Sequence, residues 1–183
     1  MSEKIANPGA LGLGGFALTT FLLSFINAGI LDPANLGVVL GMAFFYGGLA
    51  QVLAGMWEFK TGNIFGVTCF TSFGSFWMGL ALMIVLEAAG IIPAVPPAGL
   101  AVLLVAWGIF TLYATFAAIK APKGVLILFI ALTITFFLLA AGEFSPGFKL
   151  AGGYLGILVA FIAWYGSAAI LINDMYGRKV LPI

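Results

Sequence analysis

Long apolar stretches alternate along this chain with short segments that carry most of its polar and charged residues. A helix needs roughly 20 apolar residues to cross a bilayer core, whereas strands of a membrane barrel alternate apolar and polar residues over roughly ten. The apolar stretches of this chain have the length of membrane-spanning helices and lack the alternation of barrel strands. The pattern predicts an all-α integral membrane protein with six transmembrane helices, at about residues 10–30, 36–57, 67–86, 98–119, 125–141 and 150–172.

The breaks between the predicted helices differ in character. Asp32-Pro33 is a turn signal that ends the first helix. Residues 58–66, between the second and third helices, are polar and contain glycine, which allows a loop or an irregular helix start buried in protein. No internal repeat is visible, so we expect residues 1–183 to form one membrane domain.

Two pairs of glycines have the spacing that lets membrane helices approach closely. Gly37 and Gly41 lie four residues apart in the second predicted helix, and Gly152 and Gly156 do so in the sixth. Because helical residues four apart share a face, each pair offers a side-chain-free strip to a neighbour.

Composition and charge support the membrane assignment and predict its orientation. Hydrophobic residues make up 63% of the chain and charged residues 7%, against roughly 25% charged in soluble domains, and the mean hydropathy is +1.23. A net charge of +1 gives no reason to expect a nucleic-acid partner. With six helices, all basic residues except Lys149 fall on the side of the two termini, so the positive-inside rule predicts cytoplasmic termini in the cytoplasmic membrane. These basic residues are Lys4, Lys60, Lys120, Lys123, Arg178 and Lys179.

The residues that most enzymes need are scarce. The chain has no histidine, and its single cysteine, Cys69, lies in an apolar and aromatic run where packing is the expected role. We find no nucleotide-binding loop, metal-ligand cluster or nucleophile–base pair, so we expect neither enzymatic activity nor a metal or other cofactor.

Hydrogen-bonding side chains within the apolar stretches are the candidate functional groups, because lipid cannot satisfy them. They either bond to helices or line a route for a polar solute. A small anion needs weak, repeated sites in order to bind and leave, and neutral hydroxyls and amides suit that task. The candidate lining residues are Thr19, Thr20, Asn27, Gln51, Thr68, Thr71, Ser72, Ser75 and Thr111.

Asn7 and Pro8 precede the first predicted helix. Asn is a good helix N-cap and Pro suits a first helical position, so a helix-start signal is one interpretation; a box that folds against the cytoplasmic mouth is the other. Water and glycerol channels use two Asn-Pro-Ala boxes at facing half-helices. This chain has only Asn7-Pro8-Gly9, so that class is disfavoured.

Three motifs, in order, resemble one known family. NPGALGLGGF at residues 7–16 is similar to an NPxPLGLxxF opening, with Ala10 in place of the second proline. FYGGLAQVLAGMWEFKTGNIFGVTCFTSFGSFW resembles the central signature, and YGRKVLPI is similar to the closing motif. The chain thereby resembles the acetate uptake transporter family over nearly its whole length.

The resemblance implies a site and an assembly. It places Phe16, Phe73 and Leu132 at a narrow apolar constriction inside each protomer, with Phe73 where the bacterial relatives carry Tyr, which makes the constriction drier. It also implies a homo-hexamer in the lipid bilayer and transport of acetate and related short carboxylates such as succinate.

The coupling of that transport is left open. Glu58, in the E-x-K run with Lys60, either pairs with Lys60 at the membrane edge or takes up a proton in symport. A channel is favoured, because no acidic residue lies firmly in the middle of a predicted helix. The alternative function is a non-transporting membrane scaffold or sensor, indicated only by the small-residue helix faces.

Overall fold

The computed structural model describes residues 5–182, so Lys4 lies outside the described part of the chain. Within these residues the regular structure is entirely helical, and six helical spans are long and apolar enough to cross a membrane. This confirms the predicted fold class. The spans are Gly9–Asn27 (α1), Pro33–Thr61 (α2 and α3), Ile64–Ala88 (α4), Pro97–Ala118 (α5), Lys123–Gly142 (α6) and Pro146–Tyr176 (α7).

The polar stretch at residues 58–66 is a tight turn between two helices. α3 (Gln51–Thr61) continues through Glu58 and ends at Gly62, whose φ of 73° is the left-handed conformation that favours glycine. α4 starts after Asn63, whose side-chain oxygen accepts a hydrogen bond from the Gly66 N–H at 3.1 Å. Both helices are therefore longer at this end than predicted.

The second span changes its winding along its length. A 3-10 turn at Pro33–Asn35 leads into α2 (Leu36–Phe44), a π-helical segment at Phe45–Ala50 follows, and α3 completes the span. Glycines allow this segment to touch α1: a Cβ on Gly15 would collide with the Tyr46 carbonyl, and one on Gly47 with Thr19. The two helices thus meet at backbone level, which a larger residue at either glycine would prevent.

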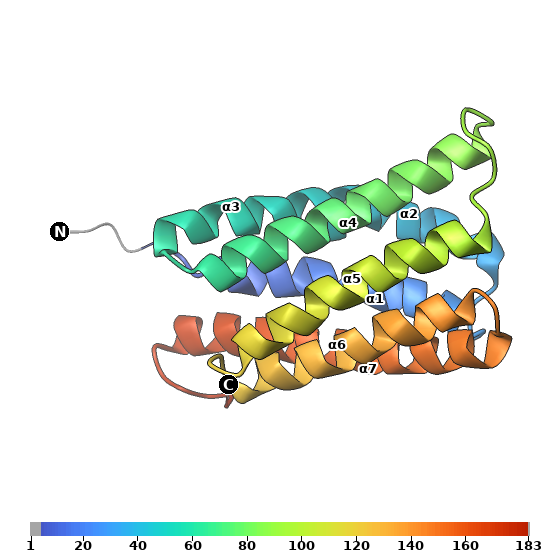
Figure 1. The fold of residues 1–183 in the computed structure, drawn as a ribbon. Coiled ribbons are helices and arrows are strands. Elements are labelled where there is room, and N and C mark those ends of the chain that lie inside the picture. Colours follow the sequence, from blue (N-terminus) through green and yellow to red (C-terminus); the bar gives the residue numbers. More distant parts are fainter. Residues whose placement is uncertain (1–4, 183) are drawn as a thin grey trace.

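α1 lies between two helix pairs (Figure 1). The α3–α4 hairpin is on one side and the α6–α7 pair on the other, with α5 packed mainly on α6. Close approach of α7 depends on glycines: a Cβ on Gly153 would collide with the backbone of Ala28, and one on Gly156 with Ser24. Gly152 packs against Leu139 of α6 in the same way.

The other predicted glycine pair has no such neighbour. A Cβ at Gly37 or Gly41 would meet nothing within 4 Å among the described residues. Among residues 5–182 the expected close helix contact at this pair is therefore absent, because α2 turns this face away from the bundle.

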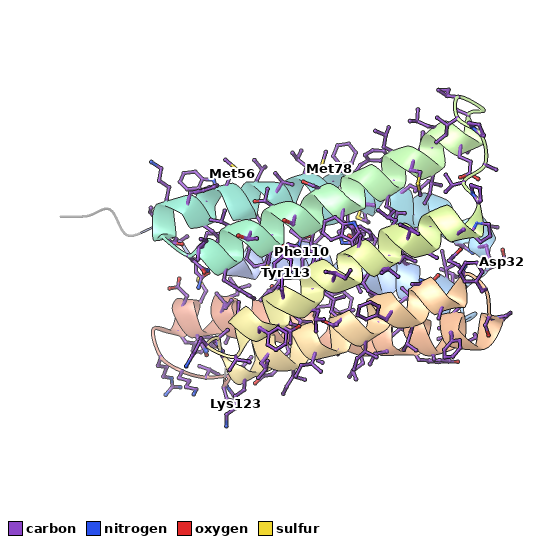
Figure 2. The ribbon with its side chains drawn as sticks, viewed as in Figure 1. Asp32, Met56, Met78, Phe110, Tyr113 and Lys123 are labelled. Atoms are coloured by element: carbon purple, nitrogen blue, oxygen red, sulfur yellow. The ribbon has the colours of Figure 1, made fainter. Side chains whose placement is uncertain are left out.

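The closing YGRKVLPI motif folds back onto α7. The Asn173 side chain accepts hydrogen bonds from the Val180 and Leu181 N–H groups at 2.7 and 2.8 Å and donates one to the Leu181 carbonyl at 2.8 Å. The described ends of the chain lie at one end of the bundle (Figure 1), together with Lys123, while Asp32 is at the opposite end (Figure 2).

Candidate functional site

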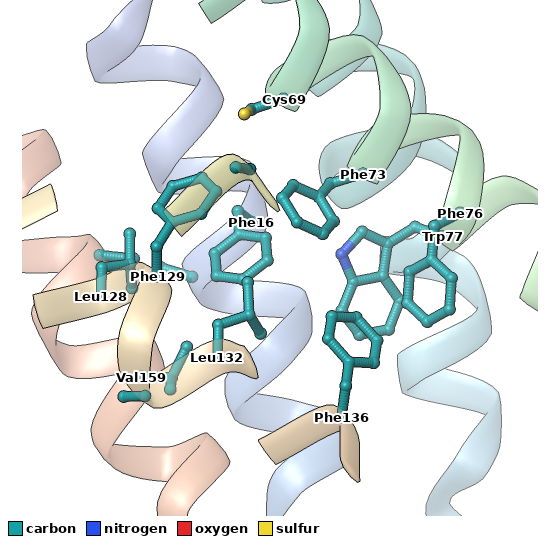
Figure 3. Packing of buried hydrophobic residues seen from close by; sticks show 14 of the residues in the cluster. Phe16, Cys69, Phe73, Phe76, Trp77, Leu128, Phe129, Leu132, Phe136 and Val159 are labelled. Carbon is teal, nitrogen blue, oxygen red and sulfur yellow. The ribbon is translucent and has the colours of Figure 1, made fainter. Parts of the chain in front are cut away.

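Three apolar side chains from different helices meet in the middle of the bundle. Phe16 of α1, Phe73 of α4 and Leu132 of α6 are all buried. The ring centroids of Phe16 and Phe73 are 5.6 Å apart, and Figure 3 shows Phe16 and Leu132 pointing toward one another. The structure therefore brings together the residues that the resemblance placed at a constriction; we call Phe16, Phe73 and Leu132 the neck.

The neck is surrounded by further aromatic rings. The Phe73 ring stacks nearly parallel to Phe136 at 6.3 Å, and its centroid is 6.1 Å from that of Phe129. Phe136 in turn packs edge-on against Phe76 at 5.6 Å. The surroundings of the neck are therefore strongly apolar.

Two cavities border the neck from opposite ends of the bundle. The Glu58 cavity has a volume of about 390 Å³, and its lining includes Asn7, Gln51, Glu58 and Lys120. The Trp77 cavity has a volume of about 570 Å³, and its lining includes Thr20, Asn27, Trp77 and Lys149. Phe16 and Leu132 line both cavities. The two spaces therefore lie in series, with the neck between them.

The cavity linings follow single helix faces. On α1 the lining residues Phe16, Thr20 and Ser24 are spaced by four, which keeps them on one side of the helix. On α4, Phe73 and Trp77 have the same spacing and line the Glu58 cavity and the Trp77 cavity, respectively. One stripe on each helix thus passes from one cavity to the other.

Thr20, Asn27 and Gln51 are the predicted polar lining residues that face a cavity. Thr19 does not: it is buried against Gly47, and its hydroxyl donates to the Gly15 carbonyl at 3.1 Å. Neighbouring residues on a helix point about 100° apart, so Thr19 and Thr20 could not both face the route. Thr111 is also buried and bonds its own helix at the Trp107 carbonyl.

The hydroxyl residues of α4 also line neither cavity, which corrects their expected role. Thr68, Thr71, Ser72 and Ser75 form a stripe on the far side of the helix from Phe73. Thr71 packs against Gly55 of α3. Thr68 and Ser75 are exposed on the outside of the chain, and Ser75 donates to the Thr71 carbonyl at 2.8 Å.

Glu58 is buried, with 3% of its surface exposed. Its Oε2 accepts hydrogen bonds from the Thr61 hydroxyl at 2.7 Å and the Asn63 amide at 3.1 Å. Of the two alternatives for Glu58, the pairing with Lys60 is wrong, because residues two apart lie on opposite sides of a helix and Lys60 is exposed. Glu58 instead joins α3 to the turn before α4.

Asn7 and Pro8 begin α1 in a slightly different way from the predicted cap. The helix starts at Gly9, Pro8 is the flanking residue, and Asn7 Oδ1 accepts a hydrogen bond from the Gly9 N–H at 2.9 Å. Asn7 and Gly9 also line the Glu58 cavity, so the two interpretations of this motif are compatible.

Charged residues stand at both outer ends. Lys120 lines the Glu58 cavity, and Lys149 and Glu143 line the Trp77 cavity. Lys149 Nζ and Glu143 Oε1 are 3.9 Å apart, with the lysine side chain 47% exposed. Within residues 5–182, no three His, Cys, Asp or Glu side chains are grouped so that they could hold a metal ion.

Several lining residues were missed from the sequence: Ser24, Asn63, Trp77, Thr135, Glu143 and, as site residues, Lys120 and Lys149. Trp77 was hidden in an apolar run, where an indole is expected to pack. Its spacing of four from Phe73 was the available signal.

A bundle of six membrane-spanning helices, with two cavities that meet at an apolar neck, is the architecture of a protein that passes small solutes through a bilayer. The chain belongs to the GPR1/FUN34/yaaH family, whose model matches residues 1–178.

Two named relatives and a solved structure are similar over the whole bundle. The succinate-acetate/proton symporter SatP of Escherichia coli K12 is 40% identical over 184 residues, covering 100% of this chain and 97% of the symporter. Acetate permease A of Emericella nidulans is 36% identical over 199 residues, covering 100% of this chain and 67% of the permease. The solved structure of the bacterial acetate channel SatP matches with a TM-score of 0.95 at 40% identity, covering 98% of this chain and 99% of the channel.

Proposed function

We propose that this protein carries acetate and related short carboxylates such as succinate across a membrane. The observation that carries the proposal is that Phe16 and Leu132 line both cavities. Opening the neck would therefore join the two cavities into one route through the bundle. The similar proteins are named a symporter, a permease and a channel, not enzymes. A scaffold or sensor would not require two cavities in series.

We propose that the solute moves as through a channel, down its gradient, and that wetting or a small side-chain motion opens the neck. Support comes from the position of Glu58, which lies four residues before the helix-ending Gly62 and not beside the neck. In the symport alternative Glu58 carries the proton, because it is the acidic side chain in the lining of its cavity.

Flux into proteoliposomes tests both statements. Purified protein should admit labelled acetate faster than empty liposomes, and uptake no faster than the empty vesicles would end the proposal. An imposed proton gradient should not drive acetate above equilibrium if the route is a channel. Accumulation driven by that gradient would favour the symport alternative and make Glu58→Gln the first variant to measure.

The proposed setting is the cytoplasmic membrane, with both termini in the cytoplasm. Lys60, Lys120, Lys123, Arg178 and Lys179 all lie toward the end that carries the termini, which supports this orientation. A cysteine introduced at Lys123 should react with a membrane-impermeant reagent only from the cytoplasmic side, and one at Lys149 only from the other side.

We also propose a homo-hexamer. The free face of α2 supports self-association, since a Cβ at Gly37 or Gly41 would meet nothing within 4 Å among the described residues and Val38 between them is exposed. A hexamer mass is expected in mild detergent, and a monomer mass would contradict the proposal.

A further inference from the structure

Two polar side chains near the neck are buried without a hydrogen-bond partner among the described residues. They are Thr20, through Oγ1, and Trp77, through Nε1. Their side chains are nearly inaccessible, at 6% and 4% exposed. Both line the Trp77 cavity, Thr20 from α1 and Trp77 from α4. A buried polar group without a partner is unfavourable, so such a pair inside a cavity points to a ligand.

Thr20 differs from other buried threonines of the bundle. Thr19, Thr111, Thr133 and Thr135 each donate to the carbonyl four residues earlier on their own helix, at 2.7–3.1 Å. That bond is the ordinary way for a membrane helix to satisfy a hydroxyl. Thr20 makes no such bond among the described residues, and it lines the Trp77 cavity together with Phe16.

Trp77 limits what the ligand can be. An indole N–H donates a hydrogen bond and cannot accept one. Figure 3 shows the indole nitrogen on the side of the ring that faces Phe16 and Leu132. Whatever binds Trp77 must therefore present an acceptor, and it must do so at the edge of the neck.

We propose that Thr20 and Trp77 form a carboxylate-binding site on the Trp77-cavity side of the neck. The Thr20 hydroxyl and the Trp77 N–H donate to the carboxylate oxygens, while Phe16 and Phe136 contact the short alkyl part of the solute. The inference rests on the proposed function and names the residues that hold the solute before or after it passes the neck.

The site binds weakly because its donors are neutral. The cation in the lining of this cavity is Lys149, which is paired with Glu143. A neutral donor pair suits a solute that must leave again. It also selects for acceptors, since ammonium has only donors to offer to an indole N–H.

The direct test follows indole N–H signals by NMR in protein labelled with ¹⁵N-tryptophan, with acetate exchanged for chloride at constant ionic strength. The Trp77 signal is assigned by its loss in Trp77→Phe. Acetate should shift it saturably, with a weaker response in Thr20→Val, and methylammonium chloride should not shift it. The Trp107 signal is the internal control, because Trp107 lies in the same aromatic cluster but lines neither cavity. A Trp77 signal that acetate leaves unmoved, or that methylammonium moves equally, overturns the inference.

Flux separates this inference from the proposed function. Trp77→Phe and Thr20→Val should each raise the acetate concentration for half-maximal flux at least about tenfold, the low end of the effect of one lost hydrogen bond to a charged group. Trp107→Phe and Thr68→Val remove the same groups outside the cavities and should change it less than about twofold.

The outcomes are distinguishable. If the wild-type protein carries acetate but all four variants match it, the site is wrong and the function stands. If the wild-type protein carries no acetate, the function fails, and a saturable shift of the Trp77 signal would still support the site. Circular dichroism and elution volume identify any variant that fails to fold, and for such a variant the wild-type NMR titration decides. If the variant is Trp77→Phe, single Trp→Phe changes at the other three tryptophans assign the Trp77 signal by elimination.

Discussion

The two cavities border the same neck but use their polar side chains differently. In the Glu58 cavity the carboxylate is held by Thr61 and Asn63, so it stabilises the α3–α4 turn. In the Trp77 cavity Thr20 and Trp77 are buried with no partner among the described residues. The difference shows that burial of a polar group does not by itself indicate function. What distinguishes the two cases is whether the protein itself satisfies the group.

The largest expected effect is on the Glu58 side. Glu58→Ala removes the carboxylate that accepts from Thr61 and Asn63, leaving Thr61 only its bond to the residue-58 carbonyl, and should lower the free energy of unfolding by about 2 kcal/mol. Glu143→Ala, at the mouth of the other cavity, removes a partly exposed ion pair and should cost no more than about 1 kcal/mol. Thermal or denaturant unfolding in detergent measures both. Equal losses would show that the two acidic residues are not used differently.

The next effect concerns the neck that separates the cavities. Leu132→Ala removes most of a side chain that both cavities share, so acids with one or two more methylene groups than acetate should pass more easily. We expect their flux relative to acetate to rise about tenfold. Leu126→Ala is the matched control, because Leu126 is on the same helix, is partly buried and lines neither cavity. Unchanged selectivity in Leu132→Ala would exclude this leucine from the constriction.

Gln51 is a polar residue of the Glu58 cavity that the protein does not fully satisfy, so it tests the difference between the two cavities. It lines the Glu58 cavity, is 1% exposed, and its Oε1 has no partner among the described residues. If it contacts the solute, Gln51→Met, which keeps the length but loses the amide, should reduce acetate flux about threefold. A flux equal to wild type would mean that Gln51 does not contact the solute, and that the unsatisfied groups that bind it are confined to the Trp77 cavity.

The smallest expected effect is at the outer mouth. Lys149→Gln breaks the 3.9 Å contact with Glu143, but the lysine is half exposed and water screens the pair. Stability should change by less than about 1 kcal/mol. At low ionic strength, acetate flux through the variant should be about half that through the wild-type protein. In high salt the two fluxes should be equal, because salt screens the attraction of an exposed lysine for an anion. A large loss that salt does not reverse would mean that Lys149 binds the solute directly.

The fold followed from the sequence because the bilayer imposes its own length scale. Six apolar stretches near 20 residues long leave little choice of span number, and the spans of the structure match them within a few residues at most ends. The π-helical segment at Phe45–Ala50 was not foreseen. It depends on close packing of Gly47 and Gly15 across two helices, which a local pattern does not reveal.

The site was predictable in its apolar part and less so in its polar part. The family resemblance named Phe16, Phe73 and Leu132, and the structure brings them together. Of the neutral polar residues, Thr20, Asn27 and Gln51 reach a cavity, whereas the α4 hydroxyl stripe faces α3 and the outside. Amino-acid type identifies a group that lipid cannot satisfy, but not the neighbour that satisfies it.

The sequence by itself determined that this protein spans a membrane with six helices and, through its motifs, which family it resembles, because both depend on residue order alone. Only the tertiary structure decided that Thr20 faces a cavity while Thr19 faces Gly47, and that Glu58 bonds Asn63 and not Lys60. The physical reason is that a one-residue step turns a side chain by about 100°, so its surroundings depend on which helix packs there.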